Sequence, residues 1–188
     1  RGTAGPVLIV PLFVPYDHSL RPSHVPEERV REWARRKGVK PADIAAIDPT
    51  PHATMGDWCV ERVRISERRI EEALAPTESA SDSIPTVLIN HFPPRNDLIR
   101  LVRIFRFGPW CGTRSTETWA RRYGAKAVVY GHLHLPATDH LAGVRYEEVS
   151  LGYPRERGVE RAPRTYLREI LPGPTDEERH SGPRWHAP

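Results

Sequence analysis

Three short apolar runs are separated by stretches in which apolar residues recur at helical spacing among charges. The runs cover residues 7–14 (VLIVPLFV), 86–89 (TVLI) and 127–130 (AVVY) and are rich in β-branched side chains. A continuous run of this kind predicts a strand that is buried in a sheet. We therefore expect three buried strands with helices between them.

Helical spacing and helix-boundary residues predict five helices. The longest, residues 57–74, carries an apolar stripe on an otherwise charged surface, and Leu98, Leu101, Val102 and Phe105 follow the same spacing. The predicted helices are residues 26–37, 41–47, 57–74, 98–105 and 116–123. Residues 144–151 and 165–171 alternate well enough to predict strands of a second sheet. Strands that alternate with helices and then follow one another favour an α/β fold with a sheet-on-sheet region.

The chain length of 188 residues fits one domain with a sizeable core. We assign residues 1–171 to that domain, with a surface linker at residues 75–83. Residues 172–188 are rich in proline, glycine and charge, which is typical of a flexible tail.

The net charge of +4 comes mainly from arginine, whose planar fork suits phosphate. An arginine-rich surface exposed to solvent explains this positive charge more simply. Binding to nucleic acid remains possible. Cys59 and Cys111 form no CxxC pair, so a reducing, cytoplasmic setting is the default. The first apolar run is too short to span a membrane. Nothing in the sequence predicts the oligomeric state.

Two of the apolar runs are followed within two residues by a histidine. His91 follows the run at residues 86–89, and Gly131-His132-Leu133-His134 follows the run at residues 127–130. Ligands in α/β sheets bind where the carboxyl ends of adjacent strands meet. In extended backbone His132 and His134 would point the same way, and Gly131 would allow a tight turn before them.

Imidazole nitrogens are good ligands for zinc, iron and manganese ions. A lone histidine is more often a hydrogen-bonded core or loop residue, but the two strand-terminal motifs together favour metal ligation. Three histidines alone could hold one catalytic zinc. That alternative lacks a general-base carboxylate in any recognisable motif.

Asn90-His91-Phe92-Pro93-Pro94 and Gly131-His132-Leu133-His134 resemble the last two motifs of calcineurin-like metallophosphoesterases. The resemblance continues through residues 143–145 and 148–154 and covers about residues 85–156. It implies a four-layer α/β/β/α sandwich that is incomplete at its N-terminus. It also implies two divalent ions (manganese, iron or zinc), with His91 and His132 on one and His134 on the other. The implied activity is hydrolysis of a phosphomonoester or phosphodiester by a metal-activated hydroxide.

The family pattern also needs Asp-x-His, Gly-Asp-x-x-Asp and Gly-Asn-His, and this chain contains none of them. Asp17-His18 lacks the intervening residue, and Val60 stands where the second aspartate of Gly56-Asp57 should be. We therefore expect the catalytic residues upstream of Arg1 rather than in this chain. The competing interpretation is a degenerate homologue, a non-catalytic basic domain that binds phosphate or nucleic acid on the same scaffold.

Three other features lie near these motifs. Arg95 follows Pro94 and could either reach a substrate phosphate or be an ordinary surface residue. The segment Tyr16-Asp17-His18 follows a predicted strand and could line the same cleft. Residues 110–113 (WCGT) form a loop for which aromatic packing is a simpler explanation than a substrate mouth. The sequence does not identify the substrate.

Overall fold

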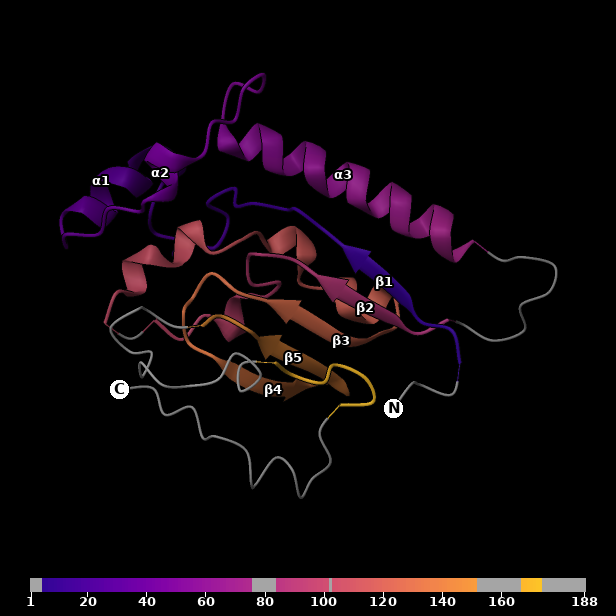
Figure 1. Ribbon diagram of the computed structural model, residues 1–188. Helices are drawn as coiled ribbons and strands as arrows, with labels where there is room; N and C mark the ends of the chain where they lie inside the picture. Colours follow the sequence, from indigo (N-terminus) through magenta and orange to yellow (C-terminus); the bar gives the residue numbers. More distant parts are fainter. Residues whose placement is uncertain (1–4, 76–83, 102, 152–166, 174–188) are drawn as a thin grey trace.

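A computed structural model describes residues 5–75, 84–101, 103–151 and 167–173. It contains one five-stranded sheet with the strand order β1-β2-β3-β5-β4 (Figure 1). Strands β1 (Leu8–Pro11), β2 (Thr86–Ile89), β3 (Ala125–Tyr130) and β5 (Val144–Glu148) run parallel, and β4 (Ala137–Leu141) is antiparallel to β5. The α/β class and the three strands expected from apolar runs are confirmed, with β2 at the expected residues.

Strand β1 is shorter and less buried than its apolar run predicts. It lies at the edge of the sheet and pairs only with β2 among the described strands. Its residues alternate between partly buried and exposed, and Ile9 is 54% exposed. The prediction of a fully buried strand was wrong here because an edge strand receives less cover than a central one.

The assignment of residues 144–151 to a second sheet was also wrong. Strand β5 pairs in parallel with β3 in the single sheet, with Tyr130 opposite Glu148. Residues 167–171 form no strand, and residues 165–166 lie outside the described ranges. A second sheet is not seen in the described part of the chain, so the four-layer sandwich stays a prediction.

The helical segments agree with the predictions except in one region. The structure has α-helices α1 (Val30–Arg35), α2 (Asp43–Ala46), α3 (Met55–Leu74) and α4 (Trp119–Arg122) and 3-10 turns η1 (Glu27–Arg29), η2 (Asn96–Leu98), η3 (Phe105–Trp110) and η4 (Arg114–Thr116). The helix predicted over residues 98–105 is wrong. Leu98 and Leu101 pack into the sheet core, whereas Phe105 is 58% exposed, so tertiary packing divides residues that share a helical spacing.

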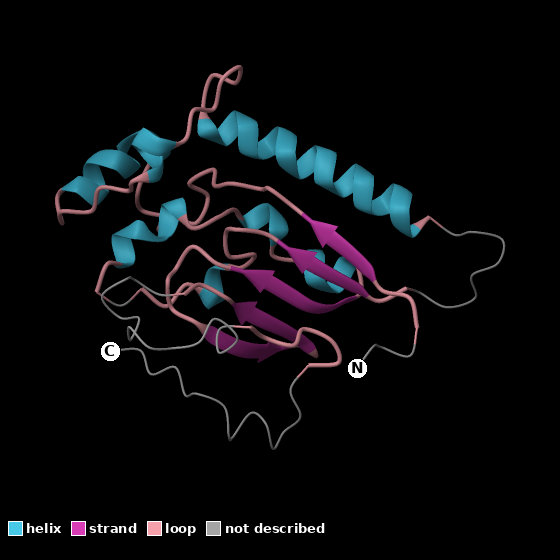
Figure 2. Cartoon of the chain, in the orientation of Figure 1, coloured by secondary structure: helices cyan, strands magenta, loops and turns pink. Residues whose placement is uncertain are grey.

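The core consists of two clusters. The larger joins the sheet to α3 and α4 through residues such as Leu88, Val128, Ile70 and Trp119. The smaller lies around Trp110, where the segments after β1 and β2 meet α1. Figure 1 shows α3 running along the β1 side of the sheet and α1 and α2 beside the ends to which the parallel strands point. Helices, strands and loops are distinguished in Figure 2.

Both cysteines are buried free thiols. Within the described ranges, no helix has the length and apolar character needed to cross a membrane. Of the predicted linker and tail, residues 76–83 and 174–188 lie outside the described ranges.

Replacement of Thr54 by alanine is expected to lower the free energy of unfolding by about 1 kcal/mol. Thr54 is the N-cap of α3, and its hydroxyl oxygen accepts a hydrogen bond from the backbone N–H of Asp57 at 3.1 Å. Thr54→Ser keeps this acceptor and serves as the control. Denaturant unfolding measures both, and equal losses in the two variants would contradict the capping role.

Candidate metal centre

The carboxyl ends of β2 and β3 bring two of the predicted histidines into contact. His91 lies two residues after β2 and His132 two residues after β3. His91 Nε2 lies 3.2 Å from His132 Nδ1, and the rings are nearly perpendicular at 79°. His134 acts electrostatically on both rings. The three histidines thus gather at one edge of the sheet.

The backbone at the Gly-His-x-His motif is a tight turn and not an extended strand. His132 and His134 both have positive φ, at 75° and 56°. The N–H of Leu133 donates to the carbonyl of Gly131, and the Leu133 side chain is buried. The extended-backbone prediction was therefore wrong. Left-handed backbone is strained for residues other than glycine, and such strain clusters at functional sites.

Aromatic rings enclose His132 and set its charge. Its ring stacks against Phe107 at 5.4 Å and lies 4.6 Å from Phe92. Burial and, to a smaller extent, the charges of the neighbouring His91 and His134 lower the pKa of His132 to about 4. Burial also lowers the pKa of His91, while the charges of Asp43 and Glu148 oppose that shift. Both rings are therefore neutral near pH 7, which is the form that binds metal ions.

The nitrogen atoms that face each other have the spacing of two ligands on one ion. Zinc–imidazole distances of about 2.0–2.1 Å in a tetrahedral site separate two ligand nitrogens by about 3.3 Å. His132 Nε2 is buried, and no described group meets it in hydrogen-bonding geometry, although the Trp110 backbone lies near enough to act on its charge. As they stand, no three His, Cys, Asp or Glu side chains in the described ranges are arranged to hold a metal. The donors therefore fit a metal in chemistry and pairwise spacing, but the described residues do not form a complete cage.

The segment Tyr16-Asp17-His18 packs beside this site. Asp17 accepts a hydrogen bond from the Thr113 hydroxyl at 2.7 Å, which ties the segment to the loop at residues 110–113. Trp110 is fully buried and lies edge-on to the His18 ring, with centroids 5.2 Å apart. The aromatic-packing interpretation of this loop is confirmed.

The Arg95 guanidinium is engaged by a neighbouring carboxylate. Its Nε and Nη2 donate to the two oxygens of Asp97 at 2.9 and 2.6 Å, and this pairing raises the pKa of Arg95. A substrate phosphate would have to compete with Asp97 for the same fork. A contact between Arg95 and a substrate phosphate therefore remains a prediction.

Two carboxylates near the histidines were not predicted. Asp43 of α2 acts electrostatically on His91, burial raises its pKa, and its Oδ2 is buried without a hydrogen-bond partner in the described ranges. Glu148 ends β5 and is fully buried. Neither stands in a recognisable motif, so only the folded arrangement connects them to His91.

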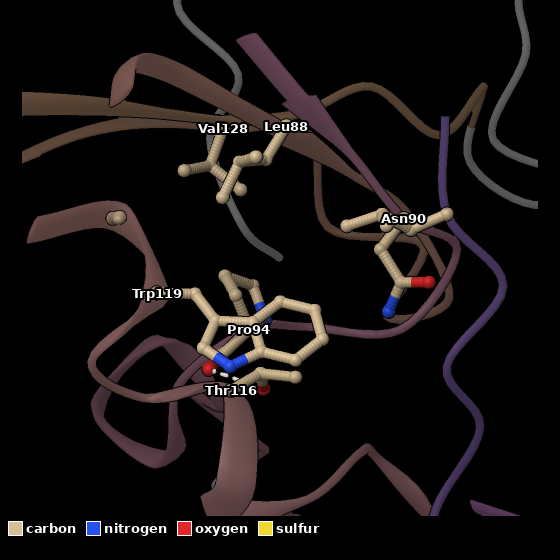
Figure 3. Close-up of a pocket in the computed structure, with 8 residues that line it drawn as sticks. Leu88, Asn90, Pro94, Thr116, Trp119 and Val128 are labelled. Atoms are coloured by element: carbon tan, nitrogen blue, oxygen red, sulfur yellow. Dashed lines mark hydrogen bonds between the residues drawn. The ribbon is translucent and has the colours of Figure 1, made fainter. Parts of the chain in front are cut away.

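An apolar pocket lies behind the strand ends (Figure 3). Leu88 of β2 and Val128 of β3 face Trp119 of α4 across it. Its lining also includes Leu12, Asn90, Pro94, Thr116 and Ala120. No described titratable side chain lines this pocket, so it does not form part of the candidate centre.

Substitution of Gly112 by alanine is expected to cost about 2–4 kcal/mol of stability. Gly112 has φ +131°, and an added Cβ would lie 2.6 Å from the Pro93 carbonyl oxygen, two residues from His91. Gly108→Ala is the control, because a Cβ there meets no atom within 4 Å. Thermal unfolding compares the variants. Similar destabilisation of both would contradict the close approach.

The metal-free protein should lose stability as the pH falls from about 6.5 to 4. Histidine in an unfolded chain titrates near 6.5, whereas His132 in the folded chain has a pKa of about 4, so the unfolded state takes up the proton first. After allowance for partial exposure, the loss attributable to this ring is about 2 kcal/mol. Denaturant unfolding at several pH values should show a shallower dependence for His132→Asn. Identical pH profiles would contradict a buried neutral ring.

No protein-family model matches the chain. The chain is 41% identical over 172 residues to the acyl-carrier-protein phosphodiesterase PptH of Mycobacterium tuberculosis, a match that covers 90% of this chain and 50% of the relative. The crystal structure of phosphopantetheinyl hydrolase PptH from the same organism superposes with a TM-score of 0.78 and 40% identity, covering 90% of this chain and 58% of that one. The chain therefore spans about half the length of the curated relative that it matches.

Proposed function

We propose that the protein to which this chain belongs is a metal-dependent phosphodiesterase. His91, His132 and His134 would be histidine ligands of two divalent ions, which we take to be manganese, iron or zinc. The observation that carries the proposal is the 3.2 Å approach of His91 Nε2 and His132 Nδ1, on an exposed and a partly buried ring at the ends of adjacent parallel strands. The similarity to a phosphodiesterase over 90% of the chain supports it.

The bound ions would polarise the phosphoryl oxygens and supply a hydroxide at neutral pH. The chain's own contribution is to keep the imidazoles neutral and fixed. Phe92 and Phe107 exclude water from the His132 ring, and the contact with His91 limits its rotation. In the overall reaction a water oxygen joins phosphorus, one P–O ester bond breaks, and the leaving alcohol takes up the proton.

We infer a phosphodiester on an acyl carrier protein as the substrate, with release of the phosphopantetheinyl group. This inference rests on the names of the similar protein and structure. It favours a diester over a monoester. Because the aspartate and asparagine motifs are absent from this sequence, we assign the activity to the complete protein. The two buried free thiols suit the expected cytoplasmic setting.

The decisive experiment uses the full-length protein with added manganese. It should contain bound metal after purification and hydrolyse both an aryl phosphodiester and a phosphopantetheinyl carrier protein. His132→Ala should lower kcat/KM by about 100-fold or more and reduce the metal content, since a direct ligand matters at least as much as an outer partner. Arg100→Ala is a control, because that exposed side chain pairs with Asp139 of β4 and not with a candidate ligand.

Unchanged metal content and activity in His132→Ala would sink the proposal. Polyanion binding that weakens steeply with salt, without hydrolysis, would instead identify the non-catalytic basic binding domain.

A further inference from the structure

Two consecutive buried glutamates end β5, and their surroundings differ. Glu147 is paired with Arg145 at 2.9 Å and Arg168 at 2.7 Å and accepts a hydrogen bond from the Thr138 hydroxyl. Glu148 is fully buried, and no described cation pairs with it. A buried carboxylate without a cation is costly to a fold unless hydrogen bonds compensate for the water that it loses. Ion pairs with two arginines compensate for the burial of Glu147, whereas no described ion pair does so for Glu148.

Both oxygens of Glu148 are held by one residue. The Ser150 hydroxyl donates to Oε1 at 2.5 Å, and the Ser150 backbone N–H donates to Oε2 at 3.1 Å. Because the hydroxyl proton points to the carboxylate, the lone pairs of Ser150 Oγ are left to accept a hydrogen bond from another donor.

Gly131 lies between Ser150 and His91. Because the strand order is β2-β3-β5, the end of β3 lies between His91, which follows β2, and Ser150, which follows β5. The N–H of Gly131 donates to the His91 carbonyl at 2.9 Å, and the N–H of Val149 donates to the Tyr130 carbonyl at 2.8 Å. A Cβ on Gly131 would lie 3.4 Å from Ser150 Oγ and 3.9 Å from His91 Nδ1. The missing side chain therefore leaves these two polar atoms facing a common space.

We infer that Glu148 and Ser150 are positioning residues that fix the tautomer and orientation of His91 across the space left by Gly131. The inference deepens the proposed metal centre and rests on it. It requires one hydrogen-bonded link between Ser150 Oγ and His91 Nδ1–H, direct or through a single water. Metal-binding histidines commonly donate their second ring N–H to such a partner, which raises the basicity of the ligating nitrogen.

The resulting proton order agrees with the contact between the rings. With its proton on Nδ1, His91 presents a lone pair at Nε2, which can accept from His132 Nδ1–H at the observed 3.2 Å. When an ion lies between these two nitrogens, His132 must turn its Nδ1 lone pair to the ion and carry its proton on the buried Nε2 instead. The proton on His91 Nδ1 is common to both arrangements, so the carboxylate would fix His91 with its ligating lone pair at Nε2. The charge of Glu148 also acts on His91, which places the two groups within electrostatic range.

The test observes the His91 ring in the metal-stripped full-length protein by long-range proton–nitrogen NMR, with signals assigned by their loss in His91→Gln. Wild-type protein should show one tautomer, protonated at Nδ1. Ser150→Ala and Glu148→Gln should give mixed tautomers, and manganese affinity in a chelator competition should fall about 10- to 100-fold. Ser150→Thr, which keeps the hydroxyl, should restore the wild-type spectrum.

Glu147→Gln is the matched control, because it removes the adjacent and equally buried carboxylate without touching Ser150. It should leave the His91 tautomer unchanged. If Ser150→Ala retains a single Nδ1-protonated tautomer, the inference is overturned, and this holds even if Glu148→Gln fails to fold. The tautomer is read without metal or substrate, so its outcome is separate from that of His132→Ala in the metal-content assay.

Discussion

The parallel pairing of β1, β2, β3 and β5 is the constraint on which the candidate centre depends. It sends the carboxyl end of each strand to one edge of the sheet, so residues far apart in sequence become neighbours there. Asn90 strengthens the arrangement, because its amide accepts from the Val14 N–H and donates to the Val14 carbonyl at 2.9 and 3.0 Å. The segment after β1 is thereby fastened to the residue before His91. Sheet geometry, and not sequence proximity, assembles the site.

Holding two histidines in left-handed backbone requires support from the rest of the fold. Leu133 supplies part of it, because its burial between His132 and His134 anchors the turn in the main core. The second core cluster supplies the remainder by placing Phe92 and Trp110 beside the His132 turn. Phe92, which lies beside this turn, also packs against the His132 ring, and burial of that ring lowers its pKa. The same contacts at this edge therefore support the turn and shape the candidate metal centre.

The sequence was sufficient for β1, β2, β3 and the histidines, although not for β4, because an apolar run and a histidine after it are local signals. An apolar run predicts a strand wherever it lies, and a histidine after each run predicts convergence once the strands are parallel. The 98–105 helix could not be excluded locally, because only the folded chain shows Leu98 and Phe105 in different environments. The sheet to which β5 belongs is likewise a long-range property, decided by its pairing with β3. Asp43 is the clearest case, since nothing in its short helix signals that its charge reaches His91.

Glu147 and Glu148 show that the sequence alone does not reveal the different surroundings of two identical side chains. They are chemically identical and adjacent, but side chains alternate along a strand, so they face opposite sides of β5. On one side Arg145 and Arg168 neutralise the charge and join the segment at residues 167–173 to the sheet. On the other side Glu148 pairs with no described cation and accepts its hydrogen bonds from Ser150, beside the histidines. The fold therefore pairs one of two buried carboxylates with arginines and places the other beside the histidines of the candidate centre.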